Sequence, residues 1–315
     1  MKRVFYIVGP TATGKSELAA EVARKCDAEI VSADAFQIYR GLDLLTAKPD
    51  RETLAKTPHH LLSAIPLSEE MNAEKFRALA LSAIQEIHVR KKSAIVVGGS
   101  GLYVKALTHG LTPLPSASRK LREQLNQFSA GELYVRLKAL DPQTACTIDR
   151  KNPRRLIRAV EICLLTGRPA SAVVAAAVSS GRHQGPAPKA FGAAITPGVF
   201  VFRDRDELYN RINRRVEAMF ANGVIDEARN LGSISATAEQ ALGLREIRRL
   251  IAGEISEQRC IAQIQQATRR YAKRQLTWFR RQTSFSPLNL SRYGHAEAIE
   301  WILREARLCF AHRDD

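Results

Sequence analysis

The sequence predicts an α/β fold in which a parallel sheet is flanked by helices and a helical domain is inserted into the core. Three observations predict this fold. A phosphate-binding loop pattern follows the first apolar segment, strand and helix patterns alternate as far as residue 111, and a second helical stretch lies between two Pro- and Gly-rich breaks. Such an alternation is typical of a parallel sheet whose strands are connected by helices.

The first predicted element is an apolar strand over residues 3–8, followed by a glycine-rich loop and a helix over 16–26. The loop, GPTATGKS, fits the pattern G-x-x-x-x-G-K-[ST] with no mismatch, which is a P-loop of the NTPase type. Its glycines allow a tight turn, and its N–H groups and the helix N-terminus face a phosphate. The pattern specifies a polyphosphate, of which ATP is only the commonest. The expected phosphate-binding residues are Gly9, Pro10, Thr11, Ala12, Thr13, Gly14, Lys15 and Ser16.

A second strand, predicted over 29–32, ends just before Asp34. Ligands of an open parallel sheet bind at the carboxyl ends of its strands, so Asp34 is expected in the same site as the P-loop. Three roles stay open for it: a Mg²⁺ ligand, a general base toward a nucleophile, or a turn residue. The Ser16 hydroxyl is the other group expected to reach a Mg²⁺ ion.

A helix is predicted over 73–90 and a third strand over 93–97, which leads into the glycine-rich turn GGSG. Such a turn permits close backbone approach, and Ser100 places a hydroxyl there, although glycine at this kind of turn often serves packing alone. A fourth strand, 198–202, is expected to rejoin the sheet, with only helices after it.

Two breaks define the domains. GLTPLPSAS at 110–118 and SSGRHQGPAPKAFG at 179–192 enclose a stretch with helical spacing and no convincing strand. The predicted core is therefore discontinuous, over 1–117 and 188–315, and the predicted helical insertion covers 118–187.

The charge distribution indicates a polyanionic partner. The chain has 48 Lys and Arg against 32 Asp and Glu, a formal net charge of +16. Residues 112–191 contain 13 basic and 5 acidic residues, so 13 − 5 gives +8, half of the excess on about a quarter of the chain. A uniform solvating surface would not be so uneven, and nucleic acid is favoured over an anionic membrane because no basic amphipathic anchor is present.

One helix of the insertion shows how this charge is presented. Asn152 is expected to cap it, Pro153 to occupy its first turn, and Gly167 to end it. Its expected apolar face comprises Leu156, Val160 and Leu164, and Arg154, Arg155 and Arg158 stand off that face. A second basic segment, 268–281, interleaves arginines with aromatics, which suits phosphate contacts and base stacking.

Other classes are disfavoured by composition. No segment approaches the about 18 consecutive apolar residues of a membrane span, and no secretory signal is recognised, so a cytoplasmic protein without a membrane partner is expected. The five cysteines form no C-x-x-C pair, and we expect reduced thiols rather than a disulfide framework or a zinc site.

Taken together, these segments resemble the tRNA dimethylallyltransferase (tRNA isopentenyltransferase) family. The resemblance covers nearly the full length, and its ordered set of motifs is much more specific than a P-loop alone. The motifs that carry it are GPTATGKS, SADAFQIYRGLDLLTAKP, HHLL, FRALALSAI, VVGGSGLYVKALTHGLTPLPSA, IDRKNPRRLIRAVEICLLTGRPAS, LYNRINRRVEAMFANG, QALGLRE and TRRYAKRQLTWFRR.

The resemblance implies a prenyl transfer. The dimethylallyl group of dimethylallyl diphosphate passes to the N6 amine of the adenosine immediately 3′ of the anticodon, and diphosphate is released. It implies Asp34 as the base that accepts the N6 proton, the P-loop with Mg²⁺ as the diphosphate cradle, and a monomer. The implied catalytic residues are Asp34, Thr11, Arg211 and Arg215, with Arg205 at the diphosphate. The implied tRNA contacts are Asp34, Ala35, Phe36, Gln37, Ser100, Arg122, Arg154, Arg155, Leu156, Ile157, Arg158, Gln240, Ala241, Leu242, Gly243, Leu244 and Arg245.

The chain departs from the usual family pattern at four positions: Ala35 stands where serine is common, Leu45 where glycine is common, Ser100 where threonine is common, and Leu244 where an aromatic is common. The loss of a hydroxyl at Ala35 bears on recognition of the anticodon loop rather than on the chemistry. Three rival functions are an adenylate isopentenyltransferase acting on free adenine nucleotides, a P-loop small-molecule kinase, and a catalytically silent RNA-binding protein.

Overall fold

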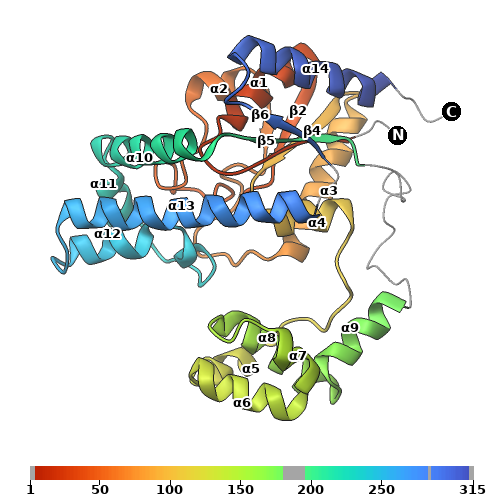
Figure 1. The fold of residues 1–315 in the computed structure, drawn as a ribbon, viewed down its shortest axis with the longest axis vertical. Coiled ribbons are helices and arrows are strands. Elements are labelled where there is room, and N and C mark those ends of the chain that lie inside the picture. The colour runs from red at the N-terminus through yellow and green to blue at the C-terminus, as the bar shows by residue number, and fades with distance from the viewer. Residues whose placement is uncertain (1–3, 180–195, 283–284, 312–315) are drawn as a thin grey trace. The chain divides into compact units, whose positions relative to one another are not determined.

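The computed structural model describes residues 4–179, 196–282 and 285–311, in two compact units (Figure 1). The larger unit comprises Met1–His109 and Ala190–Asp315, and the smaller unit comprises Gly110–Lys189. The predicted insertion, 118–187, falls within the smaller unit. Its predicted end at 187 lies outside the described residues.

The larger unit is built on one parallel sheet of six strands in the order β3-β2-β4-β1-β5-β6. The predicted α/β fold with a parallel sheet is therefore confirmed, and β5 pairs with β1 as expected. The strands are β1 (Val4–Val8), β2 (Ala28–Ser32), β3 (His59–His60), β4 (Ser93–Gly98), β5 (Gly198–Phe202) and β6 (Ser286–Asn289).

Two strands at the edges of the sheet were not predicted. The expectation of helices alone after residue 202 was wrong, because β6 follows the long helix α13 (Glu257–Gln282). β3 has only two residues, too few to show alternation, and β6 contains Pro287. Proline lacks the N–H that a central strand needs and is tolerated at an edge, so β6 carried no recognisable strand signal.

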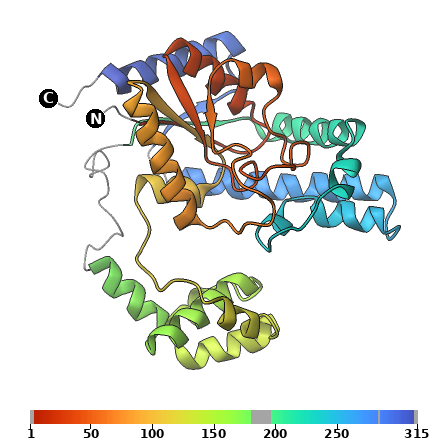
Figure 2. The same ribbon diagram turned by 180° about the vertical axis from the view of Figure 1, so that it is seen from behind.

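Side chains of β1 alternate between two cores, one on each face of the sheet. Tyr6 and Val8 belong to the core shared with α3, α4 and α13, and Phe5 and Ile7 to the core shared with α1 and α14. Figures 1 and 2 show these helices on opposite sides of the strands. The helices of this unit are α1 (Lys15–Lys25), α2 (Arg51–Ala55), α3 (Ala73–Val89), α4 (Gly101–Thr108), α10 (Arg205–Ala221), α11 (Val224–Arg229), the 3₁₀ helix η2 (Ala238–Gln240), α12 (Leu244–Ile251), α13 and α14 (His295–Ala311).

The regular elements of the smaller unit, in its described residues, are all helices, and the unit has its own core. Asn152 caps α8 through the Arg155 N–H, and left-handed Gly167 ends it, as predicted. Leu156 and Val160 are buried, but Leu164 is 49% exposed, so its assignment to the apolar face was wrong. Its helices are α5 (Arg119–Leu125), α6 (Ala130–Leu140), α7 (Pro142–Thr147), α8 (Pro153–Thr166) and α9 (Ala170–Ser179).

Membrane-span candidates were sought among the same described ranges. No single helix there is long and apolar enough to cross a membrane. Pro153–Thr166 and Ala170–Ala177 reach the required length and composition only when counted together, across a bend of 79°.

Candidate functional site

The P-loop lies at the carboxyl end of β1 and leads into α1. A Cβ on Gly9 would lie 2.1 Å from the Val201 carbonyl oxygen, so only glycine allows this approach to β5. Gly14 has φ +90°, the left-handed region that glycine favours. Inside the loop, the Thr13 hydroxyl and the Lys15 ammonium both donate to the Pro10 carbonyl, at 3.0 and 3.3 Å. The sequence thus folds locally into the turn that a phosphate cradle requires.

Three arginines that follow β5 reach the P-loop. Arg203 Nε donates to the Thr13 carbonyl at 2.9 Å, and Arg211 Nε donates to the Ala12 carbonyl at 2.8 Å. Arg215 Nη1 donates to the Thr11 hydroxyl at 3.0 Å. The fold thus brings Arg211 and Arg215 to the loop. The Arg205 guanidinium instead lies over the Tyr209 ring, 5.2 Å from its centre. Sequence reasoning missed Arg203, although its place immediately after a strand was a usable signal.

Burial perturbs the cations of this cradle. It lowers the pKa of Lys15 to about 8, against partial compensation from the Asp34 carboxylate. Burial also lowers the pKa of Arg215 to about 10, and it lowers the pKa of Arg211, with a further contribution from Arg203. Desolvated cations gathered at one loop are stabilised by an anion, which is the state that a bound polyphosphate would supply.

Asp34 lies directly beyond β2, as predicted. Its Oδ1 accepts hydrogen bonds from the Phe36 and Gln37 N–H groups, at 3.0 and 3.2 Å, so it does form a turn. This contact fixes the orientation of the carboxylate and leaves its second oxygen able to act on a ligand. The Ser100 hydroxyl accepts from the Ala35 N–H at 3.0 Å and so holds the same segment.

Gln275 of α13 joins the P-loop to the glycine-rich turn after β4. Its Oε1 accepts from the Thr11 N–H at 3.0 Å, and its Nε2 donates to the Gly99 carbonyl at 2.8 Å. The side chain is buried. Sequence reasoning missed this residue because a glutamine among arginines and aromatics has no distinctive pattern.

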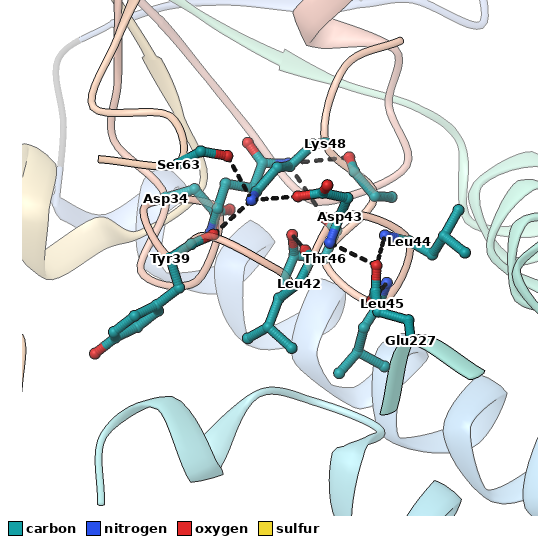
Figure 3. Close-up of polar contacts among 12 residues, drawn as sticks. Asp34, Tyr39, Leu42, Asp43, Leu44, Leu45, Thr46, Lys48, Ser63 and Glu227 are labelled. Carbon is teal, nitrogen blue, oxygen red and sulfur yellow. Dashed lines mark hydrogen bonds and ion pairs between the residues drawn. The ribbon is translucent and has the colours of Figure 1, made fainter. Parts of the chain in front are cut away.

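The segment 42–48 forms a turn beside this site (Figure 3). Glu227 of α11 accepts hydrogen bonds from the N–H groups of Asp43, Leu44 and Leu45, at 2.8, 2.7 and 2.9 Å. At the other end of the turn, the Lys48 side chain is 6% exposed. Its ammonium donates to the Tyr39 carbonyl at 2.5 Å and also to Asp43 and Ser63. The turn is therefore fixed at both ends.

An apolar pocket adjoins the P-loop. Asp34, Thr11 and Arg215 line it together with seven apolar side chains. These seven are Phe36, Leu45, Ile212, Val216, Met219, Leu242 and Ile264. The sequence had offered no residue for such a wall, because the side chains come from five separate segments that only the fold assembles.

Some arginines of the smaller unit have a different partner. Glu161 is fully buried, and Arg122 holds both of its carboxylate oxygens at 2.9 Å while Arg158 binds one at 2.6 Å. Burial alone would raise the pKa of Glu161, but the hydrogen bonds from these two arginines lower it overall. Arg158 also donates to the Pro115 carbonyl. Arg158, which stands off the apolar face of α8, is therefore already paired with an internal anion.

Other predicted tRNA contacts divide by exposure. Arg154 and Arg155 are exposed, whereas Leu156 and Ile157 pack in the core of the smaller unit. In the second segment, Gln240 and Arg245 are exposed, but Ala241 and Leu244 are buried and Leu242 lines the apolar pocket. The two runs therefore do not face solvent as a whole, and the tRNA contacts predicted for them stay predictions.

The donor set around the P-loop is compatible with Mg²⁺. Ser16 and Asp34 line one pocket together with Lys15. A hydroxyl and a carboxylate are the oxygen ligands that Mg²⁺ accepts, with phosphate oxygens and waters completing its shell. No group of three or more His, Cys, Asp or Glu residues able to hold a metal occurs in the described part of the chain.

Comparison with known proteins assigns the family. The model of the family described as IPP transferase matches residues 37–282. The chain belongs to this family. A relative named tRNA dimethylallyltransferase, from Akkermansia muciniphila, is 43% identical over 301 residues, 95% of this chain and 98% of the relative. Another, tRNA dimethylallyltransferase 1 from Citrifermentans bemidjiense, is 40% identical over 281 residues, 88% and 89% of the two chains.

Two solved structures of the IPP transferase family share the fold. The tRNA isopentenylpyrophosphate transferase from Bacillus halodurans is 32% identical, with a TM-score of 0.68 over 99% of this chain and 97% of that one. The tRNA isopentenylpyrophosphate transferase from Staphylococcus epidermidis is 30% identical, with a TM-score of 0.69 over 98% and 100%.

Proposed function

We propose that this IPP transferase moves the dimethylallyl group of dimethylallyl diphosphate to the N6 amine of the adenosine 3′ of the anticodon in tRNA. The observation that carries the proposal is the shared lining of one pocket. Thr11 of the P-loop, the Arg215 guanidinium, the Asp34 carboxylate and seven apolar side chains meet there. A diphosphate ester of a short hydrocarbon combines a polyanionic head with an apolar tail.

The residues have complementary roles in the transfer. As the bond from N6 to the prenyl carbon forms, the carbon–oxygen bond breaks and its electron pair leaves with the diphosphate. Asp34 takes the N6 proton, which offsets the poor nucleophilicity of an amine conjugated with the adenine ring. Lys15, Arg211 and Arg215 stabilise the charge that grows on the leaving group. The apolar wall excludes water, which would otherwise compete for the prenyl carbon.

Mg²⁺ is part of the proposal, and Ser16 is the residue that would bind it beside the P-loop. When bound, the ion supplies Lewis-acid stabilisation of the leaving diphosphate. Titration with MgCl₂ followed by calorimetry with inorganic diphosphate tests this role apart from turnover. We expect diphosphate affinity to rise with Mg²⁺ in the wild type and much less in Ser16→Ala.

The exposed arginines of both units, Arg154, Arg155 and Arg245, are the proposed contacts to the tRNA backbone. Arginine groups of this kind bind phosphates through charge-assisted hydrogen bonds, and such binding weakens with salt. A P-loop kinase would need neither these arginines nor the apolar pocket. An enzyme acting on free adenine nucleotides would need the pocket but not the arginines.

One assay separates the candidates. The enzyme is incubated with dimethylallyl diphosphate and either an anticodon stem-loop or AMP, and with ATP alone in a third arm. We expect prenylated RNA, no comparable product from AMP, and no rapid ATP turnover. Prenylation of AMP as fast as RNA, or ATP hydrolysis without prenyl transfer, would overturn the proposal.

Asp34→Asn tests the base itself. The amide oxygen of asparagine can still accept the Phe36 and Gln37 N–H bonds, so the turn is retained while the basic group is lost. We expect kcat to fall by about 10²–10⁴ with RNA affinity nearly unchanged. Unchanged kcat would remove Asp34 from the base role, and loss of RNA affinity together with thermal stability would indicate a structural role instead.

A further inference from the structure

The turn 42–48 resembles one turn of helix whose first N–H groups are capped from outside. Glu227 accepts from three consecutive N–H groups, those of Asp43, Leu44 and Leu45. The Ala47 N–H in turn bonds the Leu44 carbonyl at 2.9 Å. Charge-assisted bonds of this kind are the stronger hydrogen bonds of proteins, so the carboxylate fixes the backbone position of Leu45 (Figure 3).

The Leu45 side chain is fixed from a second side. It is 7% exposed and lies in the wall of the apolar pocket beside Leu242 and Ile264. Its Cδ1 is 3.1 Å from the position that a Cβ on Gly243 would occupy. The absence of a side chain at Gly243 therefore makes the room that Leu45 fills.

The same turn reaches the phosphate end of the pocket. The Thr46 carbonyl accepts from Arg215 Nη2 at 3.3 Å and from Gln37 Nε2 at 3.2 Å. Arg215 also contacts the Thr11 hydroxyl of the P-loop. The turn 42–48 thus supplies both a wall residue, Leu45, and a carbonyl, that of Thr46, which binds the Arg215 guanidinium. The distance between the apolar wall and the P-loop is therefore fixed by this turn.

We propose that Leu45, held in place by Glu227, is a specificity-determining residue that limits the size of the hydrocarbon group the pocket accepts. This inference rests on the proposed prenyl transfer. A glycine at position 45 would remove four carbon atoms from the wall and widen the pocket. The leucine makes this chain more restrictive toward a donor longer than five carbons.

The test compares dimethylallyl diphosphate with the ten-carbon geranyl diphosphate as donors to an anticodon stem-loop. In Leu45→Ala we expect the ratio of kcat/KM for the ten-carbon donor over the five-carbon donor to rise at least tenfold, since pocket contacts of a few methylenes carry such factors. In Leu45→Phe, we expect KM for the five-carbon donor to rise. Leu44→Ala is the matched control, because Leu44 is the adjacent leucine and does not line the pocket.

Glu227 is tested as a positioning residue. Glu227→Gln replaces one acceptor oxygen with an amide nitrogen that cannot accept the loop N–H groups, so we expect the donor ratio to shift in the same direction as in Leu45→Ala, by a smaller factor. Asp226→Asn is its control, because Asp226 lies on the same helix and pairs with exposed Arg229. Its donor ratio should equal that of the wild type.

Thermal unfolding of each variant accompanies the kinetics, because a buried Leu→Ala change leaves a cavity that lowers stability. An unchanged donor ratio in folded Leu45→Ala, with no KM change in Leu45→Phe, overturns the inference. If Leu45→Ala does not fold, Leu45→Phe and Glu227→Gln decide. Failure of the wild type to use dimethylallyl diphosphate would instead contradict the proposed function, so the two failures are distinguishable.

Discussion

The arginines of the two units differ in what they face. In the larger unit, Arg211 and Arg215 donate to a carbonyl and a hydroxyl of the P-loop, and burial depresses their pKa values. In the smaller unit, Arg122 and Arg158 bind the buried carboxylate of Glu161. The first pair lies at the loop that we propose binds an external anion, whereas the second pair is already bonded to an internal carboxylate. A group of basic residues in a sequence can therefore serve either of two purposes, which are binding a ligand and pairing with a carboxylate inside the protein.

Within this comparison of arginines, the largest expected effect comes from those at the P-loop. Arg215→Met removes a cation that we place at the leaving group and retains much of the apolar stem. We expect kcat/KM for the prenyl donor to fall by about 10²–10³, the scale of losing one preorganised electrostatic contact. Arg158→Met, measured in parallel with the same donor, should leave its KM unchanged. Equal losses of donor affinity in both variants would show that the P-loop arginines and the arginines bonded to Glu161 do not differ in their role.

The depressed pKa of Lys15, about 8 against an ordinary 10.5, makes the cradle pH-dependent. Because the charged form binds the anion, affinity for inorganic diphosphate should weaken as pH rises through about 8, approaching tenfold per pH unit above it. Between pH 8 and 10.5, Lys15 is protonated in the unfolded chain but largely deprotonated in the folded one. Because the unfolded state then binds more protons, the contribution of Lys15 makes the free energy of unfolding rise with pH over this range.

Calorimetry from pH 7 to 10 measures the Lys15 effect. Lys15→Arg provides the control, since arginine keeps its charge over that range and should remove this part of the pH dependence. An identical pH profile in the two proteins would assign the titration to the diphosphate itself.

Glu161 should matter more for stability than for chemistry. In Glu161→Gln the two arginines lose a charged partner, but both are partly exposed and water can solvate them, so we expect a destabilisation of about 1–3 kcal/mol. Hydrogen exchange should show this loss in α5 and α8 and leave α1 and β1 protected as before. A general loss of protection across both units would contradict a local role. Glu123→Gln, whose partner Arg119 is exposed, is the matched control.

The smallest effect is expected for a single exposed arginine of α8. Arg155→Ala should weaken anticodon stem-loop binding only a few-fold and reduce the slope of log affinity against log salt concentration by about 0.7–0.9, one phosphate contact. Filter binding at several salt concentrations gives the slope. A loss of affinity with an unchanged slope would mean that Arg155 does not contact a phosphate.

Elements with a local signal were predictable from the sequence. The P-loop, the strands β1, β2, β4 and β5, and the cap of α8 each follow from a pattern within a few residues. The Asp34 turn was one of three roles left open. Contacts between distant segments were not predictable, because no local pattern encodes them. Gln275 to Thr11 and Glu227 to Leu45 belong to this class. The Arg158–Glu161 pair lies three residues apart on one helix and could have been recognised, whereas Arg122 could not.

The Gln275 contact also sets an order of events during synthesis. Thr11 and Gln275 are 264 residues apart, which at about 5–20 residues per second means roughly 13–50 s of translation between them. β1, placed between β4 and β5, likewise acquires its second neighbour only after the smaller unit has been made. The phosphate loop therefore leaves the ribosome early yet gains its final shape late, when α13 arrives. A nascent chain carrying the complete P-loop motif should bind diphosphate poorly until that helix has folded against it.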